Sequence, residues 1–200
     1  LFDLQGQKVL EEWLIPVDAQ IETVKRLRKA IPQISFASEA HNYFHREKKY
    51  VPRWDVGLDN VGVDDITEIM TSPSLKLLAR CSEQELSSDE MLTIATKELK
   101  DLVTVTHSNP HDSLLEISAI GVSKGATLAK MAERLGISAD DCVSFGDNPN
   151  DISMLEWCGR SYAMADGHPD AHKAAKSIAE PHTDDGVAMI IEELLKLPPR

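Results

Sequence analysis

Apolar residues recur at helical spacing near the start of the chain. Ile21, Val24 and Leu27 occupy every third position of the segment 18–30, whose other positions are mainly polar. One apolar stripe on a polar helix is typical of a helix that packs against a core on one side. Pro32 follows this segment, and proline does not continue a helix. The pattern therefore predicts one amphipathic helix over 18–30.

The remainder of the first half alternates short predicted strands with short predicted helices. Residues 1–14 have the pattern of a hairpin, because apolar positions flank a Gln5-Gly6-Gln7 turn. Segment 41–62 has weak periodicity, and we expect it to be mostly loop. This alternation predicts a mixed α+β unit. Strands are predicted over 34–37, 75–79, 102–106 and 114–118, and helices over 64–72 and 88–99.

From Gly121 onward, helices and strands alternate strictly and the loops between them are short. Gly136 follows the last periodic residue of a predicted helix, where a left-handed C-cap belongs. Such repetition is typical of a parallel sheet covered by helices on both faces. Because the rhythm changes near Leu114, we expect two structural units. Helices are predicted over 124–135, 149–157, 169–175 and 185–195, and strands over 142–145, 160–164 and 177–179.

Composition and charge exclude several classes of protein. The 200 residues are 42% hydrophobic, which is enough for a folded core. The formal net charge of −12 disfavours a general nucleic-acid binder, so an anionic substrate needs a local cation. Cys81, Cys142 and Cys158 lie far apart without a CxxC motif, which disfavours a disulfide framework or a zinc knuckle. The longest strictly apolar run, 187–191, is too short for a membrane span. We expect a soluble, cytoplasmic protein.

A cluster of polar residues follows the predicted strand 142–145. Gly146 permits a tight turn, and Asp147 comes at the carboxyl edge of a parallel sheet, where open α/β sheets place their ligands. Asp147 is therefore a candidate ligand for a hard metal ion. Asn148 precedes a proline suited to the first helical position, and Asn150 and Asp151 lie in the first turn. The alternative is that Asn148 and Asp151 only cap the helix.

Lys124 lies at the start of a predicted helix, directly after Ser123. A cation at this position opposes the helix dipole, so a partner anion is expected. The alternative is an ordinary solvated lysine. If the strands before Lys124 and before Asp147 are neighbours, the two turns converge at one sheet edge. That layout suits Mg²⁺-assisted phosphoryl transfer.

Several motifs occur in an order and spacing that resemble a known family. Over residues 114–195 the chain is similar to the carboxy-terminal half of Cof-type phosphatases of the haloacid dehalogenase superfamily, and residues 16–113 resemble that family's α+β cap by position and pattern. The motifs are Gly121-Val122-Ser123-Lys124-Gly125, Phe145-Gly146-Asp147 with Asn150-Asp151-Ile152-Ser153-Met154-Leu155, Ala163-Met164, and Asp185-Gly186-Val187-Ala188.

The resemblance implies a fold and a set of roles. The fold is α/β, with a Rossmann-like parallel-sheet core, incomplete and formed by 1–15 and 116–200, and an inserted α+β cap, 16–115. Lys124 matches the lysine that steadies the nucleophilic aspartate and the phosphoryl oxygens. Asp147 matches the carboxylate that binds Mg²⁺. Asn150 and Asp151 match the pair that orients phosphate, metal-bound waters and the lysine.

The chain departs from the family pattern in two places. The family's DxDG(T/S) motif, which supplies the nucleophile and the acid/base, is absent, and so is its Ser/Thr phosphate-binding motif. Phe2-Asp3-Leu4-Gln5-Gly6-Gln7 mimics the first motif, but we interpret it as a hairpin turn. We expect the nucleophile to lie upstream of the fragment, and the fragment alone to be inactive. Ala165-Asp166-Gly167 stands where the family commonly has Gly-Asn-Ala.

Other histidines offer weaker signals. His107 and His111 have metal-like spacing, but Pro110 lies between them, so we expect polar loop residues. His41 and His45 flank aromatic residues in a locally basic segment. That segment could hold an anionic or ring-bearing ligand, although a solvated loop is the favoured alternative.

We therefore hypothesise a Mg²⁺-dependent phosphatase that acts on a small phosphorylated metabolite through an aspartyl-phosphate, with the cap selecting the leaving group. A sugar phosphomutase is an alternative within enzymes. The alternative from another class is a truncated, catalytically dead protein that binds a phosphorylated ligand or a protein partner. The upstream coding sequence discriminates between them, and no nucleic-acid or membrane partner is expected.

Overall fold

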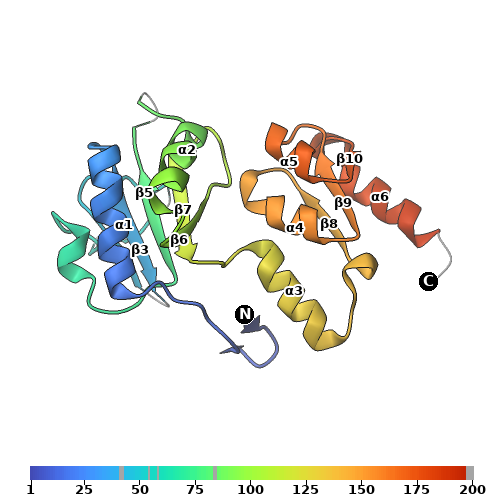
Figure 1. Ribbon diagram of the computed structural model, residues 1–200, viewed down its shortest axis with the longest axis horizontal. Coiled ribbons are helices and arrows are strands. Elements are labelled where there is room, and N and C mark those ends of the chain that lie inside the picture. The colour runs from blue at the N-terminus through green and yellow to red at the C-terminus, as the bar shows by residue number, and fades with distance from the viewer. Residues whose placement is uncertain (41–42, 54, 58, 83–84, 197–200) are drawn as a thin grey trace. The chain divides into compact units, whose positions relative to one another are not determined.

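The protein consists of two compact units, Leu1–Val122 and Ser123–Arg200, each with its own sheet (Figure 1). The computed structural model describes residues 1–40, 43–53, 55–57, 59–82 and 85–196. Among these residues, no helix is both long enough and apolar enough to cross a bilayer.

In the first unit, the described strands form a five-stranded antiparallel sheet with the order β4-β3-β5-β7-β6. A separate hairpin, β1 with β2, lies at the start of the chain. The elements are β1 (Phe2–Asp3), β2 (Lys8–Val9), α1 (Val17–Ala30), β3 (Ser35–Ala40), β4 (Tyr43–Arg46), the 3₁₀ helix η1 (Ile66–Ile69), β5 (Lys76–Arg80), α2 (Ser88–Leu99), β6 (Val103–Thr106) and β7 (Leu114–Ala119).

The core of the first unit lies between one face of this sheet and the helices α1 and α2 (Figure 1). Alternation along the strands places Phe36, Leu77 and Ile117 in this core. Leu27 of α1 and Met91 of α2 are buried against them. Burial of these side chains is the main driving force that holds the helices on the sheet.

A buried carboxylate ties the loops of the first unit to α1. Glu47 is 4% exposed and accepts hydrogen bonds from the backbone N–H groups of Phe36 and Ile66, both at 3.0 Å. Arg28 forms ion pairs with Glu47 and with Asp65. The guanidinium of Arg28 is the main cause that lowers the pKa of Asp65 to about 2. One cation therefore holds two acidic loop residues.

In the second unit, the described strands form a three-stranded parallel sheet with the order β10-β9-β8. Leu155, Ala163 and Ala171 form a buried cluster between α4, β9 and α5. The elements are α3 (Lys124–Leu135), η2 (Ala139–Asp141), β8 (Val143–Gly146), η3 (Pro149–Asp151), α4 (Ile152–Trp157), β9 (Arg160–Met164), α5 (Pro169–Ala174), β10 (Ser177–Ala179), η4 (His182–Asp184) and α6 (Gly186–Leu195).

Most of the predicted elements are confirmed. The hairpin of residues 1–14 is present, and Gly136 caps α3 in the left-handed conformation with φ 68°. The fold class is confirmed as well: a parallel α/β sheet with a separate antiparallel sheet.

One local prediction was wrong, and two others hold only in part or with a change of detail. Residues 43–46 form a strand rather than loop, because they pair with β3. The helix expected over 64–72 is only the short η1, which Asp65 caps by accepting a hydrogen bond from the N–H of Thr67. The helix expected over 149–157 is present, with its first turn as the 3₁₀ helix η3 and the rest as α4.

The boundary between the units differs from the expected one. It falls after Val122 rather than after Leu115, because β7 pairs with both β5 and β6 and belongs to the antiparallel sheet. Residues 1–15 also group with the first unit, whereas we expected them with the parallel sheet. Ile15 pairs with Ser74 of the first unit in an isolated bridge, which accounts for part of this difference.

Candidate functional site

The candidate site lies in the second unit, where β8 ends and η3 begins. Asp147 directly follows β8 and is exposed at the carboxyl end of the strand. Gly146 allows the chain to turn here, because a Cβ at this position would lie 2.5 Å from the Cβ of Asp151. The absence of a side chain at Gly146 thus lets the strand end approach the first turn of the next helix.

Asp151 is the buried centre of this turn, with only 4% of its surface exposed. Its Oδ2 accepts hydrogen bonds from the backbone N–H groups of Asp147 at 3.0 Å and of Asn148 at 3.3 Å. Its Oδ1 contacts the Nζ of Lys124 at 2.5 Å. A buried carboxylate needs such partners, because removing it from water costs on the order of several kcal/mol. The turn and the lysine are thereby fixed by one group.

Lys124 is the first residue of α3, and its side chain is 51% exposed. The hydroxyl of Ser123 caps this helix by accepting a hydrogen bond from the N–H of Ala126 at 3.1 Å. The idea that neighbouring strands bring Lys124 and Asp147 together was wrong: β7, which precedes Lys124, is not in the same sheet as β8.

Packing of α3 against α4 brings the lysine to the site instead. The backbone N–H of Gly125 donates to the hydroxyl of Ser153 at 3.0 Å. A Cβ on Gly125 would lie 2.2 Å from the carbonyl oxygen of Ser153, so only glycine allows this approach. Ser153 and Gly125 therefore position Lys124 against Asp151.

The carboxylate of Asp147 faces a mixed environment. Its Oδ2 accepts a hydrogen bond from Nδ2 of Asn148 at 2.7 Å. Desolvation raises the pKa of Asp147 above its ordinary value, the charge of Asp151 raises it further, and Lys124 lowers it. The carboxylate is thus held where additional positive charge would stabilise its ionised form.

The remaining site residues lie on adjacent segments. Asn150 lies within η3 and is partly buried. The loop after β9 also contacts the site, because the backbone N–H of His168 donates to the carbonyl of Asp147 at 2.7 Å. In the same loop, Asp166 forms an ion pair with His182.

Sequence reasoning missed two positioning residues, Ser153 and His168. Pro169 after His168 signals a helix start, and that signal could have marked His168 as a cap. Ser153 lies within the motif quoted above but was given no role there, since its role depends on a contact between two helices.

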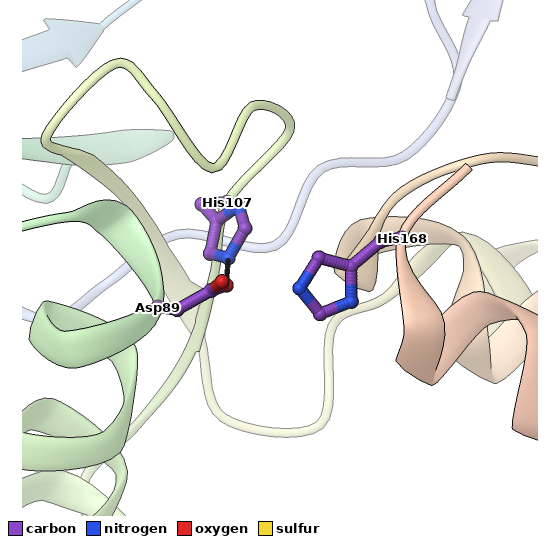
Figure 2. A group of neighbouring side chains, drawn as sticks. All are labelled: Asp89, His107 and His168. Atoms are coloured by element: carbon purple, nitrogen blue, oxygen red, sulfur yellow. Dashed lines mark hydrogen bonds and ion pairs between the residues drawn. The ribbon is translucent and has the colours of Figure 1, made fainter. Parts of the chain in front are cut away.

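His107 differs from the polar loop residue that we expected. It is fully buried in the first unit, and its Nε2 donates to Oδ1 of Asp89 at 2.7 Å (Figure 2). His168, also drawn there, belongs to the second unit. His111 is exposed, as a loop residue should be. The contact with Asp89 gives the buried ring of His107 a hydrogen-bond partner within its own unit.

Comparisons with known proteins show the family and the fold of this chain. A model of the haloacid dehalogenase-like hydrolase family matches residues 2–191. The chain belongs to this family. Its fold is the one found in subclass IIB members: the sugar phosphatase BT4131 covers 94% of this chain with a TM-score of 0.71 at 16% identity, and 70% of that protein is covered. SMU.1108c from Streptococcus mutans UA159 has a TM-score of 0.76 at 22% identity, with 96% of this chain and 72% of that one covered.

Curated relatives match over shorter stretches. The 5-amino-6-(5-phospho-D-ribitylamino)uracil phosphatase YcsE of Bacillus subtilis is 29% identical over 107 residues, which make up 54% of this chain and 43% of that protein. A phosphoglycolate phosphatase of Methanothrix thermoacetophila is 35% identical over 80 residues, or 40% of this chain and 36% of that protein. The matched part is less than half of either relative.

The close approach of α3 to α4 predicts the effect of a single methyl group. Gly125→Ala should destabilise the second unit by roughly 1–3 kcal/mol through overpacking, although in an open helix position the same change stabilises by about 1 kcal/mol. Urea unfolding measures the difference. The control is Lys130→Ala on the exposed side of the same helix. A Gly125→Ala variant at least as stable as the wild type would contradict the packing argument.

Proposed function

We propose that this chain carries the lysine and the metal-binding carboxylate of a Mg²⁺-dependent phosphatase that acts on a small phosphorylated metabolite. The observation that carries the proposal is the contact between Lys124 and the buried Asp151, directly beside the exposed carboxylate of Asp147. The relatives named above are phosphatases of small phosphorylated compounds, which supports this substrate class.

The side chains at this turn fit a magnesium ion by their donor chemistry. Mg²⁺ prefers oxygen ligands and retains several waters, so it is often bound by only one or two carboxylates. Asp147 offers an exposed carboxylate of which one oxygen, Oδ2, is engaged by Asn148. When bound, the ion would supply positive charge against the phosphoryl oxygens. Asn150 and Asp151 would orient its waters and the phosphate.

Lys124 is suited to hold a phosphoryl group. An ammonium has three N–H donors, and the contact with Asp151 occupies one of them. The remaining donors lie at the start of a helix, where the backbone dipole also favours an anion. Because Asp151 fixes the ammonium in advance, Lys124 can counter the charge that grows on the transferring group.

The attacking group in this proposal is a carboxylate from a segment that is not among these 200 residues, which contain no DxDG(T/S) motif. That oxygen would form a bond to phosphorus as the ester bond breaks, and the departing alkoxide would take up a proton. Water would then cleave the aspartyl-phosphate to release phosphate. Asp3 does not fill this role, because its Oδ1 accepts from the N–H groups of Gln5 and Gly6 in the hairpin turn.

Two rival functions make different predictions. A phosphomutase would return the phosphoryl group to another oxygen of a sugar rather than to water. A binding protein without catalysis would show no DxDG(T/S) motif in the upstream coding sequence. We expect that sequence to contain the motif, and the 200-residue chain alone to have negligible activity on p-nitrophenyl phosphate.

The role of Lys124 can be tested in a chain that includes the upstream carboxylate. Lys124→Ala should lower kcat by roughly 10²–10³-fold and change KM much less, since the contact strengthens in the transition state. Lys130→Ala removes an exposed lysine of the same helix and should leave both constants unchanged. An unchanged kcat in Lys124→Ala would make Lys124 a surface residue and refute its role.

Asp147 and Asp151 should have separable kinetic effects in the same extended chain. Asp147→Asn should raise the Mg²⁺ concentration needed for half-maximal activity, because it removes a direct ligand. Asp151→Asn should mainly reduce kcat at saturating Mg²⁺, because it releases Lys124. Magnesium titrations of steady-state activity measure both. The assignment fails if the two variants exchange these signatures.

A further inference from the structure

A cavity of about 110 Å³ lies within the first unit beside the edge strand β4, and none of the residues of the proposed phosphatase site lines it. It is bounded by α1, β3, β4, η1 and the segment that follows η1. The residues that line it and carry the argument are Gln20, Ser38, Tyr43, His45, Met70 and Ser74.

One side of this cavity is polar and holds an unsatisfied group. Ser74 is 2% exposed, and its hydroxyl has no hydrogen-bond partner among the described residues. A buried hydroxyl without a partner costs about 1–3 kcal/mol, so it marks a place where a ligand group would be stabilising. Gln20 is fixed nearby, because its Nε2 donates to the carbonyls of Ile15 at 2.9 Å and Ser72 at 3.0 Å. Ser38 adds a second hydroxyl.

The other sides of the cavity are formed by aromatic rings, aliphatic side chains and the polar residues Thr71 and Ser72. Ser38 is paired with His45, and Ala40 with Tyr43, so these four side chains share one face of the sheet. The rings of Tyr43 and His45 are parallel within 4°, with their centroids 5.9 Å apart. Ile66 and Ile69 of η1 and Met70, the residue after it, line the cavity with aliphatic side chains.

The charge of the lining restricts the ligand. None of the described residues that line the cavity is a lysine, arginine, aspartate or glutamate. A phosphate ester would find no fixed cation here, so the cavity does not suit the phosphorylated substrate. A polyol is a poorer match than a flat ring: Thr71 and Ser72 add polar groups to the lining, but hydroxyls that face Ile66, Ile69 and Met70 would have no partner.

We propose that this cavity binds a neutral, planar, single-ring heterocycle with hydrogen-bonding groups on one edge. Its two faces would contact the aliphatic residues of η1 and the rings of Tyr43 and His45, and its polar edge would meet Ser38, Ser74 and Gln20. At about 110 Å³ the cavity is smaller than the one of about 150 Å³ that accommodates benzene, so a single ring is the largest group it can take, and part of that ring would lie against Tyr43, which is 68% exposed. The site lies wholly within the first unit, and its test is independent of the phosphatase proposal.

Uracil is a suitable probe, because it is neutral, planar and polar along one edge. We expect it to bind the purified 200-residue chain with a dissociation constant on the order of 1 mM, measured by saturation-transfer NMR titration. Ser74→Ala and Tyr43→Ala should each weaken binding at least severalfold. Both changes spare the fold, since Ser74→Ala removes an unsatisfied hydroxyl and Tyr43 is 68% exposed. Thermal unfolding of each variant checks this.

The matched control is Val61→Ala, which alters a side chain of the same unit with the same 68% exposure but outside the cavity. It should leave uracil binding unchanged. Equal binding by all four proteins, or no binding up to the solubility limit of uracil, would overturn the proposal. Stronger competition by myo-inositol or inorganic phosphate than by uracil itself would overturn the assignment of the ligand class.

Discussion

The buried carboxylate of Asp151 is the interaction on which the candidate site depends. Its Oδ2 holds the backbone N–H groups of Asp147 and Asn148, and its Oδ1 holds the ammonium of Lys124. A desolvated charge is tolerated only when its hydrogen-bonding capacity is met, so these contacts stabilise one another. A simple helix cap would account for the hydrogen bonds to the two amides, but it does not account for the contact with Lys124.

Two glycines make this arrangement sterically possible. Gly146 lets the end of β8 lie against Asp151, and Gly125 lets the start of α3 lie against Ser153. The lysine therefore reaches the carboxylates through helix packing, while Asp147 reaches them through the end of a strand. Both routes end at Asp151, so the position of Lys124 and the shape of the turn are coupled. The proposed electrostatic site for a phosphoryl group requires this coupling.

Local patterns were sufficient to predict most elements, and they singled out Asp147 and Lys124 as candidates. The caps of α3, Ser123 and Gly136, and the turn after β8 each follow from a few neighbouring residues. What failed depended on contacts distant in sequence. The unit boundary follows from the pairing of β7 with β5 and β6, and Ser153 is significant only because α3 packs on α4. The cavity beside β4 could not be predicted for the same reason.

The most direct measurement is a double-mutant cycle between Lys124 and Asp151. Lys124→Met, Asp151→Asn and the double variant would be compared by hydrogen exchange of the amides in β8 and α4, which reports the free energy of opening of the second unit. The account predicts a favourable coupling energy of about 0.5–3 kcal/mol between the two side chains. Additivity of the two changes within about 0.3 kcal/mol would show that Lys124 is not held by Asp151 and would contradict the account.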